Sequence, residues 1–431
     1  PASLFLLFLS LVGVFKGVNF SNGSKANKRI SFDDRVAWVN ENYTQILAIA
    51  ANPETHFDYW WDDDCRGINA GAMTFRRLAA AFDFANVLAG IEAEGHGESR
   101  LPIQQDASSN WLQHTAMMLQ DETLAKLSNI ADLDDGVSRD RSQIPEDIYT
   151  RVTEELDRYW KQQRDEGKPH DFLTFFLVPE VNKRLRRRNV AKKPVMAVAY
   201  GGHPKSAGKE FMNTVGTEKF NAELGQHFSI SGMIQEISMI LKDLNGGEDV
   251  FPAEDHQKFV NQLMSDYSTA LDIVAPGYDG VKKQTRTMQG SKPPKHIRKT
   301  PNNSALGWTT PSGFVVLNHK GRVAKYPPRL AVCAPISRNW WNAQTTIYVT
   351  DMESFDQGAS VRGAPPNFTH SIDASHMHIA LANYSRTRNP ESPVALSMVH
   401  DSYGCHAANV NMLYEVVLEA FIEVHSALPL D

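Results

Sequence analysis

The chain has 431 residues, 42% of them hydrophobic, and a formal net charge of -6. This length and apolar content allow a large core divided between two or three lobes, and the negative net charge argues against blanket affinity for nucleic acid, so such contacts have to come from local basic clusters. Its three cysteines, Cys65, Cys333 and Cys405, lack the CxxC or Cys/His spacing of a zinc site or a disulfide framework.

The predicted elements begin with an apolar run at residues 2–15. The run is shorter than the roughly 20 residues that cross a membrane and lacks the basic start of a secretion signal, so we expect a buried helix and no membrane partner. Trp308–Val316 predicts a turn that leads into a strand, and Thr345–Thr350 predicts a further strand. Helical periodicity covers residues 33–51, 72–93, 110–129, 146–164 and 406–427.

Two acidic residues end short strand patterns that are far apart in the sequence. Asp106 ends the stretch 99–106, and Asp401 follows the apolar, strand-forming run 394–399. Two carboxylates about 4 Å apart repel by roughly 4 kcal/mol at an effective dielectric constant near 20, so a shared site needs cations. Magnesium prefers oxygen ligands and is commonly held by one or two carboxylates together with substrate phosphates. The pattern predicts a shared two-magnesium site, although each acid alone is more simply explained as a turn cap.

A basic stretch that becomes apolar lies between the two acids, at residues 184–201. On a helix, Arg188 and Lys192 lie about 40° apart and Tyr200 about 80° further round, so all three share one broad face. A guanidinium, an ammonium and an aromatic ring on one face suit a nucleoside triphosphate. The alternatives are an ordinary solvated basic helix, and a helix that begins only near Pro194, because proline inside a helix removes a hydrogen bond.

Positive charge is concentrated in two segments of the chain. Residues 183–193 and 282–299 each contain seven Lys or Arg residues. The second segment also contains Gly290, Pro293 and Pro294, which is typical of a mobile loop. We expect both segments to contact phosphate backbones, with binding that weakens steeply as salt rises.

Four motifs of the chain follow one another in an order that a known protein family shares. They are Asp106-Ala-Ser-Ser-Asn-Trp-Leu-Gln-His114; Arg188, Lys192, Tyr200 and Gly201, spaced as R-x3-K-x7-YG; Pro366–Met377; and His400-Asp-Ser-Tyr-Gly404 followed by His406-Ala407. The first and last resemble the two palm motifs of the single-subunit DNA-dependent RNA polymerases of bacteriophages and mitochondria. The second resembles the fingers-helix motif of that family, and the third resembles the segment before its second palm motif.

The resemblance implies an α+β, mostly helical fold, namely a right-hand polymerase core with a small antiparallel palm sheet and large helical fingers. It places the palm at residues 1–118 and 370–431 and the fingers at 119–369, with the nucleotide-binding helix near 184–201. The chain would then lack the thumb and the N-terminal domain of the family. We therefore expect either a fragment or a catalytic subunit whose missing half is supplied by a second polypeptide.

The resemblance also implies roles for residues of the palm motifs. Asp106 and Asp401 would bind two magnesium ions, with the backbone carbonyl of Ala107 as a further ligand, and His400 would belong to the catalytic set. Ala107 replaces a common glycine, which we expect to be tolerated if its φ is negative. Trp111 replaces a second glycine and would either narrow the nucleotide pocket or stack on nucleic acid.

The fingers motif would supply the nucleotide contacts. Arg188 and Lys192 would grip the incoming ribonucleoside triphosphate, and Lys192 would also assist the departure of pyrophosphate. Tyr200 and His370 would lie near the ribose and favour a 2′-hydroxyl, and Gly201 would let the helix end pivot past the template base. The implied enzyme is a DNA-directed RNA polymerase, a nucleotidyltransferase whose partners are a DNA template and nascent RNA. It would act in the host cytoplasm if phage-encoded, or in the mitochondrial matrix if eukaryotic.

Three other functions remain as alternatives at this point. DNA polymerases of the related family A share the fingers spacing, but they carry a glutamate where this chain has Asn110, a difference that favours ribonucleotides. A non-catalytic nucleic-acid-binding polymerase subunit is the second alternative, although a purely structural descendant would not need both metal-binding acids. A metal-dependent phosphohydrolase could use the doublet His400-Asp401, but it would need further His and Asp ligands on helices.

Overall fold

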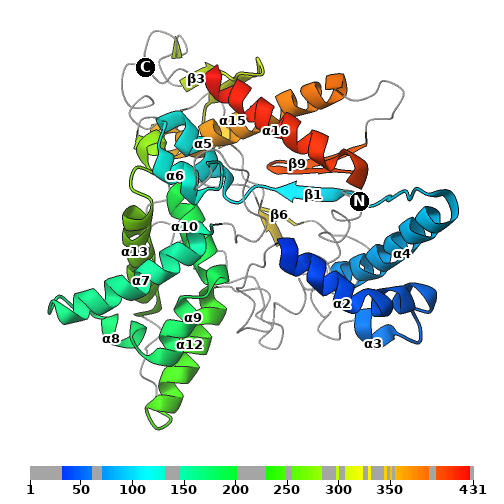
Figure 1. Ribbon diagram of the computed structural model, residues 1–431. Coiled ribbons are helices and arrows are strands. Elements are labelled where there is room, and N and C mark those ends of the chain that lie inside the picture. The colour runs from blue at the N-terminus through cyan, green and yellow to red at the C-terminus, as the bar shows by residue number, and fades with distance from the viewer. Residues whose placement is uncertain are drawn as a thin grey trace. The chain divides into compact units, whose positions relative to one another are not determined.

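α-Helices dominate the computed structural model, and its strands form small antiparallel sheets (Figure 1). This confirms the expected mostly helical α+β class. The chain divides into two compact units, one made of Pro1–Tyr278 with His376–Asp431 and the other of Asp279–Ser375. The structure describes residues 32–60, 70–131, 146–200, 230–248, 255–283, 298–299, 306–323, 329–331, 344–346, 350–351, 355–387 and 395–427. The apolar run at 2–15 lies outside these ranges.

The first helices of the described chain form a small core of their own. Val39, Ile46 and Ile49 recur at helical spacing on one helix and are buried together with Phe84 of another. Both long helices match the predicted ranges. The elements are α2 (Phe32–Ala51), α3 (Phe57–Trp60) and α4 (Ala70–Glu94).

The largest core within the described residues belongs to the helices between positions 110 and 274. At its centre the Trp160 indole donates a 2.8 Å hydrogen bond to the Asp266 carboxylate. The single helix predicted at 110–129 is wrong, because Gln120 adopts a φ of +52° and divides it into two helices. The helices are α5 (Asn110–Leu119), α6 (Glu122–Leu127), α7 (Ile148–Asp165), α8 (Leu173–Phe176), α9 (Pro179–Leu185), α10 (Arg188–Ala199), α12 (Ile230–Leu244) and α13 (His256–Val274).

Helix α10 carries the predicted nucleotide-binding face. It begins at Arg188 and contains Pro194, so the alternative of a start near Pro194 is wrong. Proline lacks the N–H that would donate a hydrogen bond to the preceding turn of the helix. Burial of Val195 and Val198 in the large core offsets the loss of that hydrogen bond. Tyr200 closes the helix, with its backbone N–H donating to the Met196 carbonyl at 3.0 Å.

A three-stranded antiparallel sheet joins two segments that are about 300 residues apart in the sequence. Its order is β1–β10–β9. The central strand, β10, is the second strand of the β9–β10 hairpin. Tyr403 and Cys405 of the central strand are buried against Leu413 and Val416 of the C-terminal helix. That helix confirms the prediction at 406–427, apart from a short 3-10 turn at its start. The elements are β1 (Ile103–Asp106), β9 (Leu396–Val399), β10 (Ser402–Cys405), η3 (Ala407–Asn409) and α16 (Val410–Ser426).

The second unit contains short strands and the first part of a long helix. The turn predicted within Trp308–Val316 joins β3 to β4, and the Trp308 indole donates to the Ser371 hydroxyl at 2.9 Å. The stretch predicted as one strand, 345–350, instead contributes to two strands with different partners. The elements are β2 (Arg298–Lys299), β3 (Leu306–Thr309), β4 (Val315–Asn318), β5 (Arg322–Val323), β6 (Arg329–Ala331), β7 (Gln344–Thr346), β8 (Thr350–Asp351) and α15 (Gln357–Thr387), which continues into the first unit.

Among the helices of the described ranges, none combines the length and apolar character that crossing a membrane requires.

Candidate active site

The sheet brings Asp106 and Asp401 to the same edge. In the β1–β10 register Asp106 lies opposite Ser402, the residue after Asp401. The backbone N–H of Ala107 donates a 3.1 Å hydrogen bond to the Asp401 carbonyl, which ties the two strand ends together. Two acids that are 295 positions apart in the sequence therefore meet through backbone pairing.

The carboxyl groups of Asp106 and Asp401 interact electrostatically. The pKa of Asp106 is raised, first because its carboxyl group is partly buried and then because the negative charge of Asp401 is near. Asp106 nevertheless keeps an exposed surface, so the site is open to solvent. The positive charge of Lys192 acts in the opposite direction and lowers that pKa, which places the ammonium of α10 within electrostatic reach of the acids.

The turn between β9 and β10 holds Asp401 in a constrained position. His400 and Asp401 are the only residues between the paired positions Val399 and Ser402. His400 has a φ of +51°, a left-handed conformation that costs an L-residue about 1 kcal/mol but that histidine adopts more readily than most residues. The imidazole is exposed, and Asp401 lies next to it at the hairpin tip.

The donors at this edge suit magnesium. Two carboxylates and a backbone carbonyl supply only oxygen, and magnesium completes its octahedron with water and substrate phosphates. Ala107 does not have a positive φ, so alanine meets the condition for replacing glycine there. Within the described ranges, no group of three or more His, Cys, Asp or Glu side chains is arranged to hold a metal ion.

The cations of α10 lie against one aromatic ring of α7. The Arg188 guanidinium carbon is 5.1 Å from the centre of the Tyr149 ring, and the Lys192 ammonium nitrogen is 5.9 Å from it. Arg188 also pairs with Asp147, whose Oδ2 lies 2.5 Å from the arginine Nε. Sequence analysis did not find Asp147 or Tyr149, since an acid before a helix usually indicates only an N-cap.

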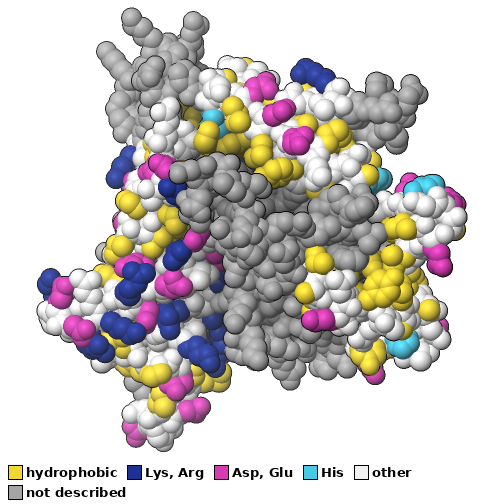
Figure 2. Space-filling model, in the orientation of Figure 1, with side chains coloured by type: hydrophobic (Ala, Val, Ile, Leu, Met, Phe, Trp, Pro, Cys, Tyr) yellow, Lys and Arg dark blue, Asp and Glu magenta, His cyan; other side chains and the backbone are white. Residues whose placement is uncertain are grey.

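The rest of the basic run is neutralised by acids of neighbouring helices. Arg184 and Arg187 pair with Glu236 of α12, and Arg186 lies 3.8 Å from Asp157 of α7. Figure 2 shows the same mixture, with Lys and Arg side chains interspersed with Asp and Glu over this helical region. The arginines predicted to contact phosphate backbones therefore have acidic partners, whereas Lys192 is exposed and its charge lowers the pKa of Asp106. Most of the second basic segment, 284–297, lies outside the described residues.

The remaining predicted site residues have different locations. Tyr200 is half-buried at the end of α10 and packs against the large core, and Gly201 lies outside the described residues. His370 is exposed on the part of α15 that belongs to the second unit. Trp111 is buried and packs edge-on against Tyr278, with ring centres 6.0 Å apart. This packing shows a core residue and gives no support to the two predicted roles, narrowing the nucleotide pocket or stacking on nucleic acid.

A buried histidine cluster lies under the central strand of the sheet. Nδ1 of His114 and Nε2 of His425 are 3.0 Å apart, and His376 donates from Nε2 to the Val417 carbonyl at 2.8 Å while its Nδ1 accepts from the Tyr403 hydroxyl at 3.1 Å. Burial lowers the pKa of all three histidines, and that of His425 falls to about 4. The cluster joins α5, α15 and α16 beneath the strand that leads from Asp401.

Comparison with known proteins gives a consistent result. The family model described as DNA-dependent RNA polymerase matches residues 16–431. The mitochondrial DNA-directed RNA polymerase of Schizosaccharomyces pombe is 27% identical over 95% of the chain and 30% of its own length. The DNA-directed RNA polymerase of Enterobacteria phage T3 is 23% identical over 91% of the chain and 41% of its own length. The human mitochondrial DNA-directed RNA polymerase is 24% identical over 95% of the chain and 27% of its own length. The chain thus spans less than half the length of these relatives.

Proposed function

We propose that this chain, which belongs to the DNA-dependent RNA polymerase family, forms the catalytic core for template-directed synthesis of RNA from ribonucleoside triphosphates. The observation that carries the proposal is the meeting of Asp106 and Asp401 at one sheet edge, with the charge of Lys192 acting on Asp106. This arrangement brings two acids to one sheet edge, within electrostatic reach of a lysine of α10. Nucleotidyl transfer needs both charges, the acids (the acidic half of the site) for metal ions and the cations of α10 (the basic half) for the triphosphate.

In this proposal residues 1–118 and 370–431, which include the sheet edge, α5 and α16, form the palm, and residues 119–369, which include α6 to α13, form the fingers. Asp106, Asp401 and the Ala107 carbonyl would hold two magnesium ions, which when bound would acidify the attacking 3′-hydroxyl and neutralise the leaving pyrophosphate. The turn at His400 fixes where the Asp401 carboxylate lies. The backbone bond from Ala107 fixes the distance between the strand ends.

The basic half binds and orients the nucleotide. Arg188 and Lys192 would neutralise the triphosphate oxygens, and Lys192 would stabilise charge as it shifts to pyrophosphate. Tyr200 would contact the ribose and favour a 2′-hydroxyl, while Gly201 would allow the end of α10 to move past the template base. A DNA template and nascent RNA would bind beside the two halves.

The relatives support this reading over the other functions considered. All three compared proteins are named RNA polymerases, from a phage or from mitochondria, so either the host cytoplasm or the mitochondrial matrix is a suitable location. Asn110, at the start of α5, stands where family A DNA polymerases carry a glutamate, so the acidic side chain expected to block a 2′-hydroxyl is missing. Because the chain spans less than half of its relatives, we propose that full activity needs their remaining segments, in the same polypeptide or in a second one.

The test is magnesium-dependent extension of a primed DNA template, with ribonucleotides and with deoxyribonucleotides. We expect Asp106→Asn and Asp401→Asn each to reduce ribonucleotide addition by about 10³-fold or more, because each removes a metal-binding charge, while template binding stays unchanged. Asp165→Asn, at an exposed acid of α7, is the matched control and should extend normally. Synthesis at the normal rate in either palm variant would contradict the proposal, and preferential use of deoxyribonucleotides would favour a DNA polymerase.

A further inference from the structure

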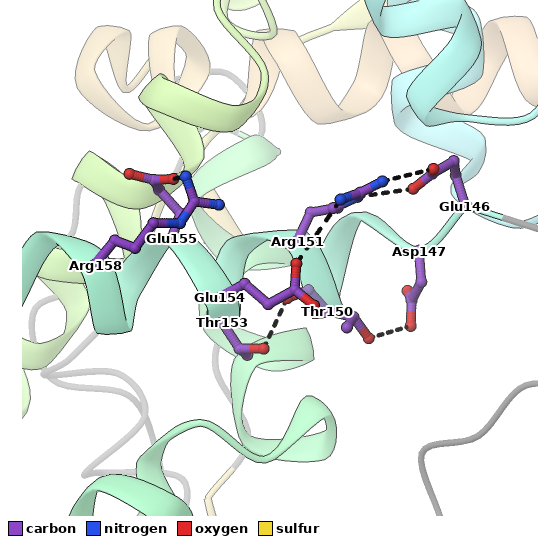
Figure 3. Close-up of polar contacts among 8 residues, drawn as sticks. All are labelled: Glu146, Asp147, Thr150, Arg151, Thr153, Glu154, Glu155 and Arg158. Atoms are coloured by element: carbon purple, nitrogen blue, oxygen red, sulfur yellow. Dashed lines mark hydrogen bonds and ion pairs between the residues drawn. The ribbon is translucent and has the colours of Figure 1, made fainter. Parts of the chain in front are cut away.

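Asp147 immediately precedes α7 but does not act as a normal helix cap. Its side chain accepts no hydrogen bond from the backbone of the first turn. Instead, Oδ2 accepts from the Thr150 hydroxyl at 2.9 Å and from Arg188 Nε at 2.5 Å. Figure 3 shows the Asp147 carboxylate held by Thr150 at the start of α7. The carboxylate is thus oriented by its own helix and directed at α10.

The guanidinium of Arg188 is bound by Asp147 along its Nε edge. Among the described residues the two Nη groups donate to no other partner. A guanidinium binds carboxylate and phosphate oxygens with the same planar geometry, so the Nη edge matches a phosphate. The side chain of Asp147 is 9% exposed and that of Arg188 is 26% exposed, which leaves the arginine as the accessible member of the pair.

Tyr149 supports both cations from beneath. Its ring is buried, and the Ser109 hydroxyl and Trp111 indole lie next to its hydroxyl without reaching full hydrogen-bond geometry. Burial raises the pKa of this hydroxyl, so the ring stays neutral at physiological pH. A fixed aromatic face attracts both cations, and Asp147 reduces the repulsion between two positive charges that are four residues apart on α10.

We propose that Asp147 and Tyr149 are positioning residues that hold Arg188 and Lys192 in the geometry that accepts a triphosphate. This inference rests on the proposed function and adds α7 to the nucleotide-binding apparatus. Neither residue contacts the nucleotide in this arrangement. Their contribution is to order two long side chains before the nucleotide arrives, which removes part of the entropy cost of binding.

The experiment measures ATP binding by calorimetry and the KM and kcat for ATP in primed extension, on the full chain. We expect Tyr149→Leu, which removes the ring, and Asp147→Asn, which removes the charge, each to weaken ATP binding and raise KM by about tenfold, with kcat at saturating ATP nearly unchanged. Tyr149→Phe keeps the ring and should bind ATP like the unaltered chain. A structural role alone would instead lower the thermal midpoint without separating KM from kcat.

The neighbouring residue offers a matched control. Glu146 forms a two-point ion pair with Arg151, at 2.9 and 2.8 Å (Figure 3). Glu146→Gln removes an ion pair at the same helix start and should leave ATP binding unchanged. Unaltered ATP affinity in both Tyr149→Leu and Asp147→Asn would overturn the inference. Failure of the unaltered chain to extend a primer, with the remaining segments supplied, would count against the proposed function alone, and failure to bind ATP at all would overturn both.

Discussion

The acids are held by backbone hydrogen bonds between strands, whereas the cations of α10 make side-chain contacts with a different helix. Asp106 and Asp401 stay together as long as the β1–β10 register is kept. Arg188 and Lys192 instead lie against Tyr149 of α7, and Arg188 pairs with Asp147 just before that helix. A backbone ladder tolerates most side-chain changes, while a side-chain contact is lost with one substitution. The basic half is therefore the half more easily altered.

The acidic half has its own weakness in the histidine cluster beneath β10. His114, His376 and His425 have lowered pKa values in the folded state, so below pH 6.5 the unfolded chain binds protons that the folded chain does not. Stability is therefore full above that pH and is lost as pH falls toward the folded pKa values. We expect the free energy of unfolding to drop by up to about 4 kcal/mol between pH 7.5 and pH 5.5, since each of three protons contributes about 1.4 kcal/mol over the one pH unit below 6.5.

Chemical denaturation at the two pH values measures this loss. His425→Gln should reduce the pH dependence by roughly a third, since it removes one of three such groups. The matched control is His378→Gln, which alters an exposed histidine two positions from His376 on the same helix. A pH dependence that is the same in His425→Gln and in the unaltered chain would show that the cluster is not its source.

The backbone hydrogen bond between Ala107 and Asp401 can be removed by one substitution. Ala107→Pro removes the N–H that donates to the Asp401 carbonyl, and it is compatible with the extended backbone of Asp106 before it. We expect nucleotide addition to fall by about 100-fold, because a displacement near 1 Å at reacting groups has that effect. Ala107→Gly keeps the N–H and should retain the rate. An unaltered rate in Ala107→Pro, measured by single-turnover extension, would show that strand pairing alone positions Asp401.

Sequence patterns located the acidic half because its signals are local. Each acid ends a short strand pattern, and β1 and β9 lie where those patterns predict them. The pairing of β1 with β10 was expected only from the family resemblance, since strand patterns do not specify partners. Helical spacing and the resemblance together supplied the roles of Arg188 and Lys192, which remain predictions.

The basic half was harder to predict because its support comes from another helix. Asp147 and Arg188 are 41 positions apart, and no spacing rule connects the start of α7 to the face of α10. The basic run suggested phosphate contacts, but acids of α7 and α12 neutralise its arginines. Trp111 was assigned to the pocket from its place in a motif, yet the helical periodicity of α5 turns it into the core.

The smallest expected effect concerns the turn that presents Asp401. His400→Gly relieves a left-handed conformation worth about 1 kcal/mol but gives the unfolded chain more freedom, so we expect the stability to change by less than about 1 kcal/mol. Nucleotide addition should fall about threefold, because a looser turn positions Asp401 less well. His400→Asn separates the two roles of this residue, since asparagine tolerates the left-handed backbone but lacks the imidazole. Activity retained in His400→Asn and reduced in His400→Gly would assign the effect to the turn. Equal losses in both variants would contradict this account and give the imidazole itself a role in catalysis.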